Sequence, residues 1–157
     1  MSTSANAPLA ATGSALPDDP QQLAELAAAT MYDKDMASQG LGIQLASVLP
    51  GQASMTMTVR PDMLNGHKSC HGGFLFSLAD SAFAFACNSR NQVSVASGCS
   101  IDFLAPAFEG DELTATASEY SLGGRMGIYD VHVTNQDGKR IAVFRGRSYR
   151  INGLVTG

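Results

Sequence analysis

The pattern of hydrophobic and polar residues divides most of the chain into strands around one helix. Residues 73–88 are rich in Ala, Leu and Phe, lack Pro and exceed the usual strand length, which predicts a largely buried helix. Alternating hydrophobic residues on either side of Pro50-Gly51 predict a hairpin. Four further alternating segments predict strands over 93–104, 112–121, 126–135 and 140–151. The elements indicate an α+β fold, an antiparallel six-stranded sheet wrapped around one long central helix.

The rest of the chain suits a single domain with short tails. At 157 residues and 45% hydrophobic, it is long enough for one substantial core. Residues 1–17 lack the charged start and apolar stretch of a signal peptide and are expected to be a disordered tail. Asp18-Asp19-Pro20 predicts the start of a short helix that runs through Ala29. We therefore expect a domain over 18–153 and a C-terminal tail over 154–157.

Charge and cysteine content indicate the expected cellular compartment and limit the expected classes of partner. The net charge of −4 argues against nucleic acid as a partner. The cysteines are odd in number and lack a CxxC spacing, as expected of reduced thiols in a cytoplasmic protein. A charge in mid-helix at Asp80 and the pair Gly72-Gly73 fit poorly with a membrane span, so no membrane association is expected.

Asp80 is the one charged residue between Lys68 and Arg90, a stretch that is otherwise largely apolar. At helical spacing, Phe76 and Phe83 flank it on the same face. Burying an unpaired carboxylate costs several kcal/mol, so such a residue is retained either because it is paired or because it takes part in chemistry. The first case is a core Asp bonded to Ser77 or to a distant amide, and the second is a functional carboxylate.

The segment before the helix, residues 65–73, ends in two glycines, which allow a backbone to approach a ligand closely. The first helical turn offers unpaired N–H groups to a developing oxyanion, and Asp80 could attack an acyl carbon or activate water. Gly72 and Asp80 are eight residues apart, which is about 12 Å along a helix, so one chain cannot bring both to one acyl carbon. This favours a homodimer with a shared active site.

A series of motifs, ordered along about residues 25–151, resembles the hotdog-fold thioesterases of phenylacetic acid degradation (PaaI type). The motifs are Asn65-Gly66-His67, His71-Gly72-Gly73, Phe76-Ser77-Leu78-Ala79-Asp80, Ala86-Cys87-Asn88-Ser89, Ile101-Asp102-Phe103-Leu104-Ala105-Pro106 and Gly127-Ile128-Tyr129-Asp130. The resemblance implies an acyl-CoA thioesterase that hydrolyses an aryl-acetyl thioester, phenylacetyl-CoA or hydroxyphenylacetyl-CoA. It also implies that two dimers join as a homotetramer, and that coenzyme A belongs to the substrate, with no separate cofactor.

The resemblance also assigns roles to single residues. It implies that Asp80 is the catalytic carboxylate and that the Gly72 backbone polarises the thioester carbonyl. Asn65 and His71 are then the polar residues that hold the thioester or water. Whether Asp80 is nucleophile or general base stays open. Gly98 departs from the pattern, since relatives often carry a larger residue there, and this bears on the shape of the acyl pocket.

Substrate contacts are expected at both ends of an acyl-CoA. Gly73 and Phe74 lie beside the proposed site, and Phe74 could line a flat apolar slot for a ring, unless it is plain core. The other candidates for that slot are Phe76, Phe83 and Met63. Arg145 and Arg147 share one face of a strand and suit the phosphates of coenzyme A; the alternative is that they protect an exposed edge strand.

Other chemistries remain as alternatives. A non-catalytic acyl-CoA sensor of the same fold would be expected to carry a DNA-binding helix-turn-helix, which the first forty residues do not show. A dehydratase generally pairs its acid with a histidine, which Asp80 lacks at helical spacing. A thioesterase for medium-chain acyl-CoA stays open. His67, Cys70 and His71 lack a fourth ligand, so no metal site is predicted, and a Cys70 nucleophile is disfavoured.

Overall fold

The computed structural model describes residues 15–157, and residues 1–14 of the predicted tail lie outside the described residues. The helices are α1 (Pro20–Lys34), α2 (Met36–Gly40) and α3 (Gly72–Asn88), with a 3-10 turn over Pro61–Met63. The strands are β1 (Gln44–Leu49), β2 (Gln52–Thr58), β3 (Gln92–Phe103), β4 (Glu112–Gly123), β5 (Met126–Thr134) and β6 (Arg140–Leu154).

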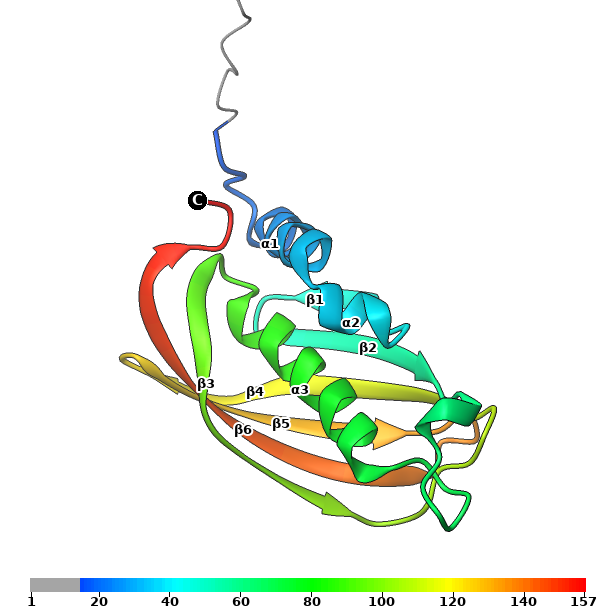
Figure 1. Ribbon diagram of the computed structural model, residues 1–157. Helices are drawn as coiled ribbons and strands as arrows, with labels where there is room; N and C mark the ends of the chain where they lie inside the picture. The colour runs from blue at the N-terminus through cyan, green and yellow to red at the C-terminus, as the bar shows by residue number, and fades with distance from the viewer. Residues whose placement is uncertain (1–14) are drawn as a thin grey trace, which may run out of the picture.

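The six strands form one antiparallel sheet in the order β1-β2-β4-β5-β6-β3. The sheet curves around α3, which lies along its concave face (Figure 1). The helix α1 lies beside β1, and β3 forms the opposite edge. The arrangement confirms the predicted α+β architecture with one central helix. Because β6 lies between β5 and β3, the alternative that Arg145 and Arg147 protect an edge strand is wrong.

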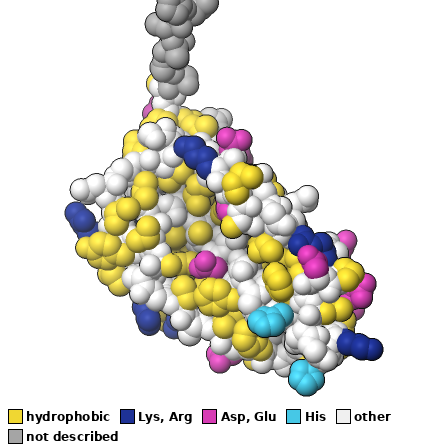
Figure 2. Space-filling model, viewed as in Figure 1, with side chains coloured by type: hydrophobic (Ala, Val, Ile, Leu, Met, Phe, Trp, Pro, Cys, Tyr) yellow, Lys and Arg dark blue, Asp and Glu magenta, His cyan; other side chains and the backbone are white. Residues whose placement is uncertain are grey.

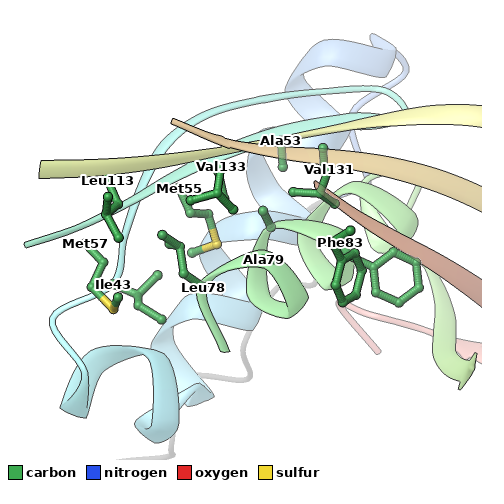
Figure 3. Packing of buried hydrophobic residues seen from close by; sticks show 14 of the residues in the cluster. Ile43, Ala53, Met55, Met57, Leu78, Ala79, Phe83, Leu113, Val131 and Val133 are labelled. Carbon is green, nitrogen blue, oxygen red and sulfur yellow. The ribbon is translucent and has the colours of Figure 1, made fainter. Parts of the chain in front are cut away.

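Small residues allow α3 to lie close to the sheet. Ala79, Ala82 and Ala86 are fully buried, and Leu78 packs with Met55 and Val133 from the sheet (Figure 3). The ring of Phe83 lies so near β6 that a Cβ on Gly146 would stand 2.7 Å from it. Helix and sheet can meet at this distance only because Gly146 has no side chain.

The N-terminal helices extend further than the sequence predicted. The helix α1 does not end at Ala29 but continues to Lys34, where Tyr32 donates a hydrogen bond at 2.8 Å to the carbonyl oxygen of Ile43, the residue before β1. A separate helix, α2, follows; its N-cap Asp35 accepts a hydrogen bond from the Ser38 N–H. None of the helices within residues 15–157 has the length and hydropathy that crossing a membrane requires.

Candidate active site

The carboxylate of Asp80 is half-buried on α3 and accepts no side-chain hydrogen bond from any residue in the described part of the chain. The hydroxyl of Ser77, its expected partner in a core role, donates to the Gly73 carbonyl oxygen at 2.9 Å instead. Asp80 is therefore not a paired core residue. Burial raises the pKa of its carboxyl group, as expected where apolar neighbours disfavour the charge.

The charge of the Asp80 carboxylate acts on two thiols, one on the edge strand β3 and one on α3 itself. Burial, and then the charge of Asp80, raises the pKa of the Cys99 thiol on that strand. Burial, with a smaller effect of the Asp80 charge, raises the pKa of the Cys87 thiol, two helical turns from Asp80, to about 12. These thiols are protonated at neutral pH, so Asp80 is the ionisable group of this region that can act as a base or nucleophile.

The first turn of α3 leaves one backbone donor free. The side chain of His71 caps the helix, and its Nδ1 accepts a hydrogen bond from the Gly73 N–H at 3.0 Å. The Phe74 N–H donates to the His71 carbonyl oxygen, also at 3.0 Å. The Gly72 N–H has no acceptor among residues 15–157. It lies at the positive end of the helix dipole, where a carbonyl oxygen that gains negative charge would be stabilised.

A cavity of about 410 Å³ opens at Gly72. Its floor is the helix start with Leu75, one wall is the loop from Asn65 to Cys70, and the other wall is residues 103–106. Phe103 and Leu104 belong to the apolar wall and are 55% and 54% exposed. A single free donor beside apolar walls suits the carbonyl and the hydrocarbon part of an acyl group.

Asn65 and His71 both shape this site, in different ways. The Asn65 Oδ1 accepts hydrogen bonds from the N–H groups of His67 and Ser69, at 2.9 and 3.2 Å, and so holds the loop closed at the cavity rim. Because Nδ1 of His71 is an acceptor, its Nε2 carries the proton in the neutral ring. His71 is exposed and, like Gly73 and Phe74, stands beside the cavity without lining it.

Asp80 does not line the Gly72 cavity. The helix α3 runs antiparallel to β3, and three pairs mark their alignment. Gly72 lies against Phe103, the charge of Asp80 acts on the Cys99 thiol, and the side-chain amide of Asn88 bonds both backbone groups of Ser94, at 2.8 and 3.0 Å. The structure therefore separates the backbone donor and the carboxylate along the helix, as the spacing of these residues predicted.

The aromatic slot predicted from the sequence is not formed. Met63 and Phe83 are buried in the core, and the ring of Phe76 packs edge-on against Phe144 with centroids 5.4 Å apart. These side chains take the plain core role that the sequence left open. Sequence reasoning missed Phe103 and Leu104 as cavity walls; the signal was two large apolar residues at the end of a strand, directly before Ala105-Pro106.

The alternative chemistries at Cys70 find no support. Cys70 is buried, and this burial, with a smaller effect of the Asp111 charge, raises its pKa to about 11. A thiol with such a pKa is not a nucleophile at neutral pH. Within residues 15–157, no three His, Cys, Asp or Glu side chains gather closely enough to hold a metal ion.

Arg145 and Arg147 project from the sheet face opposite α3. Arg145 forms a two-point ion pair with Asp130, at 2.7 and 2.8 Å, and its guanidinium carbon lies 4.9 Å from the Tyr120 ring centre. The guanidinium of Arg147 lies over Gly98, where a Cβ would stand 2.6 Å from Nη2. Gly98 thus makes room for Arg147 on this face and is not part of the Gly72 cavity.

Comparison with known proteins places this geometry in a family. Residues 67–142 match the thioesterase superfamily profile. The chain is 55% identical over 127 residues to the acyl-coenzyme A thioesterase PaaI of Escherichia coli, an alignment that covers 81% of this chain and 91% of that protein.

Solved structures support the same family assignment. The E. coli PaaI protein from the phenylacetic acid degradation operon superposes with a TM-score of 0.85 at 51% identity, covering 87% of this chain and 99% of that one. The smu.793 protein of Streptococcus mutans, solved bound to acetyl CoA, superposes with a TM-score of 0.69 at 25% identity, over 71% of this chain and 90% of that one.

Proposed function

Because the chain belongs to the thioesterase superfamily and is an acyl-CoA thioesterase of the hotdog fold, we propose that it hydrolyses aryl-acetyl-CoA thioesters, phenylacetyl-CoA or hydroxyphenylacetyl-CoA. The observation that carries the proposal is the Gly72 cavity, in which one free N–H lies beside an apolar wall with the Phe103 ring. An aromatic ring can pack against Phe103 while its carbonyl accepts the Gly72 hydrogen bond. The relative from the phenylacetic acid degradation operon supports the same substrate class.

In the proposed reaction, the Gly72 N–H and the helix dipole stabilise the oxyanion formed when the carbonyl carbon is attacked. As a general base, Asp80 takes a proton from water while the water oxygen bonds to that carbon. The C–S bond then breaks, and the coenzyme A thiolate leaves and takes up a proton. As a nucleophile, an oxygen of Asp80 bonds to the carbonyl carbon, the C–S bond breaks and releases the coenzyme A thiolate, which takes up a proton, and water then hydrolyses the mixed anhydride and regenerates the carboxylate. Both routes give the free acid and coenzyme A.

The separation of Gly72 and Asp80 requires a second chain, and the edge strand β3 supplies a surface for it. The outer side of β3 pairs with no other strand within residues 15–157, and its Val95 and Phe103 are 46% and 55% exposed. Figure 2 shows hydrophobic side chains gathered over the face that carries α3. A long edge with exposed apolar side chains is a template for pairing. We therefore infer a homodimer in which two copies of β3 pair antiparallel.

The alignment of α3 with β3 fixes the register of this pairing. Gly72 lies level with Phe103 and Asn88 with Ser94, so Asp80, midway between Gly72 and Asn88 on the helix, lies near the level of Cys99. For Asp80 of the partner subunit to reach Gly72, Cys99 of the partner subunit must lie opposite Phe103. The two-fold axis then passes at Ile101, which faces its own copy. Cys99, Ile101 and Phe103 are alternate residues on the face toward α3, as this pairing requires.

A cross-link tests this register. An Ile101→Cys variant should form a disulfide-linked dimer under mild oxidation, because directly opposed residues of antiparallel strands meet disulfide geometry. Val95→Cys is the matched control, since its two copies would lie far apart. Cross-linking of Val95→Cys but not of Ile101→Cys would contradict the register. Sedimentation would also show whether two dimers join as a tetramer.

The substrate is tested by the release of free thiol from a panel of acyl-CoAs, followed with a thiol reagent. Phenylacetyl-CoA or hydroxyphenylacetyl-CoA should give the highest kcat/KM, acetyl-CoA the lowest, and medium chains an intermediate value. The preference should be graded, because each methylene or ring contact is worth only about 1–3 kcal/mol. Equal values for aryl and acetyl substrates would reject the aryl-acetyl assignment, and a maximum at medium chains would favour the medium-chain alternative.

A further inference from the structure

A second cavity, of about 340 Å³, lies at the end of the sheet away from Gly72. It is bordered by the turn between β4 and β5, which carries Arg125, and by the last residues of β6, from Arg150 to Leu154. The Arg150 N–H donates to the Arg125 carbonyl oxygen at 2.7 Å, which holds the two backbones together. In Figure 1 this is the region where β6 ends, beside the start of β3.

The charges in this cavity are unbalanced. Arg125 and Arg150 both line it, together with Gln92 and Asn152, and its lining includes no acidic residue. Neither arginine forms an ion pair within the described chain, whereas Arg60, Arg90 and Arg145 each pair with a carboxylate. The Nε of Arg150 is buried and has no hydrogen-bond partner among the described residues.

Two like charges in one cavity and a buried guanidinium nitrogen without an acceptor are both unfavourable in isolation. A bound anion removes both penalties, because it neutralises the pair and offers several acceptor oxygens. Guanidinium groups suit phosphate in particular, since their N–H donors match its oxygens in pairs. The backbone of Gly153 adds a surface that a ligand can approach closely.

We propose that Arg125 and Arg150 bind the phosphate groups of the coenzyme A half of the substrate. The proposal rests on the proposed function and adds a recognition site to it. Within one chain, the cavity cannot serve the Gly72 site, because Gln92 and Phe103 are eleven residues apart, about 36 Å along a strand.

In the proposed dimer, the distance from Asp80 to the two arginines of the same chain fits the length of the substrate. Arg150 pairs with Ser94, which is five residues, about 16 Å, from the Cys99 level at which Asp80 lies. That span is comparable with the extended pantetheine arm that joins the thioester to the phosphates. In the antiparallel register, Ser94 of the partner subunit lies past the Phe103 end of β3. Residues 103–106 of this chain, which border the Gly72 cavity, lie at that same end. Asp80 and the arginine pair of one chain would thus hold a substrate whose carbonyl binds Gly72 of the other.

The test is calorimetric binding of adenosine 3′,5′-bisphosphate and of coenzyme A to the full chain and its variants. Arg125→Gln and Arg150→Gln should each raise the Kd of both ligands by about tenfold, the loss expected when a charge-assisted hydrogen bond is removed. Arg140→Gln is the matched control, because Arg140 is an exposed arginine outside the cavity, and it should leave the Kd unchanged. Arg125 is itself exposed, so its variant remains informative should Arg150→Gln fold poorly.

Kinetics separate phosphate recognition from catalysis. The two arginine variants should raise KM for acyl-CoA and leave kcat, and the KM for the matching acyl-pantetheine, unchanged. An unchanged Kd in Arg125→Gln would overturn the proposal, as would a loss of binding confined to Arg145→Ala and Arg147→Ala. Equal binding of inorganic phosphate and the bisphosphate would also overturn it. If coenzyme A binds at the arginines but no acyl-CoA is hydrolysed, the proposed function fails while this site stands.

Discussion

The ring of Phe103 lies against the backbone of Gly72, so closely that a Cβ on Gly72 would stand 2.8 Å from the Cζ atom of Phe103. The residue that offers the free N–H is thus in contact with the side chain that forms the apolar wall beside it. One contact couples the position of the proposed oxyanion donor to the shape of the proposed acyl cavity.

This contact predicts a rescue between two substitutions. Gly72→Ala should lower kcat/KM by about tenfold or more, because overpacking of this kind typically costs about 1–3 kcal/mol and displaces the ring into the cavity. Gly72→Ala combined with Phe103→Ala should recover part of the loss, as coupled neighbours do in a double-mutant cycle. Gly66→Ala is the control in the same loop, since nothing lies within 4 Å of its Cβ position. Strictly additive losses of kcat/KM would show that Gly72 and Phe103 are not coupled.

Asp80→Asn should lower turnover by about a hundredfold or more, since an amide neither attacks nor takes a proton. The Tm of the variant should not decrease, because Asp80 has no hydrogen-bond partner among the described residues that the substitution would remove. Steady-state kinetics and thermal unfolding together check this. A folded variant of near-normal rate, or a lower Tm with intact activity, would contradict a catalytic role.

The raised pKa of Asp80 gives this residue a pH signature. Activity should fall with decreasing pH around a pKa above the ordinary aspartate value, because only the ionised form reacts. A carboxyl group whose pKa is raised on folding makes the protein less stable as pH rises above its unfolded pKa. The Tm of Asp80→Asn should therefore exceed that of the wild type at neutral pH, and the difference should vanish in acid. A Tm difference independent of pH would argue against this effect.

Hybrid dimers should recover activity that neither parent has. Gly72→Pro removes the N–H donor at the first helical position, where the backbone accepts proline although its ring would also press on Phe103, and Asp80→Asn removes the carboxylate. After subunit exchange, a mixed dimer contains one site with an intact Gly72 and an intact Asp80. Thiol release by the mixture, compared with that of each variant alone, measures the recovery. Mixed dimers that form but stay inactive would place both residues of each site in one chain.

Gly146→Ala should destabilise the fold by about 1–3 kcal/mol, since its Cβ would overlap the buried Phe83 ring between helix and sheet. Gly123→Ala should change the free energy of unfolding little, because its Cβ would point into open space. Urea unfolding measures both. A Gly146→Ala variant as stable as the wild type would mean that α3 can shift away from β6.

The sequence predicted the sheet well because its turns are marked chemically. Gly123-Gly124 and Asp137-Gly138 end one strand and precede the next, and β5 and β6 begin at Met126 and Arg140 as predicted. The short helix α2 escaped prediction, because five residues, MASQG, show no hydrophobic period. Its stability comes from the Asp35 cap and from tertiary contact, which local patterns do not report.

For the candidate site, the sequence predicted features that depend on neighbouring residues better than contacts between distant segments. The free amide at Gly72 and its separation from Asp80 follow from helix geometry, which the sequence reveals, whereas the sequence left open whether Asp80 is paired. The predicted slot failed at Phe76 and Phe83, because helical spacing groups residues on a face but does not say whether a sheet covers that face. Phe103 reaches Gly72 from a strand that begins after the helix ends, a contact that only the folded chain defines.

The side-chain amide of Asn88 bonds both backbone groups of Ser94 on the edge strand β3. This contact limits where a further strand can pair with the sheet. Those groups face away from β6, so an added strand meets an edge already closed at that point. At the opposite edge, Gln21 of α1 donates to the Val48 carbonyl oxygen of β1 at 2.9 Å. In the proposed dimer the two β3 edges cover each other, and the Gln21 contact occupies an acceptor of the β1 edge that stays outside, which would hinder a continuing series of strands and so fibre formation.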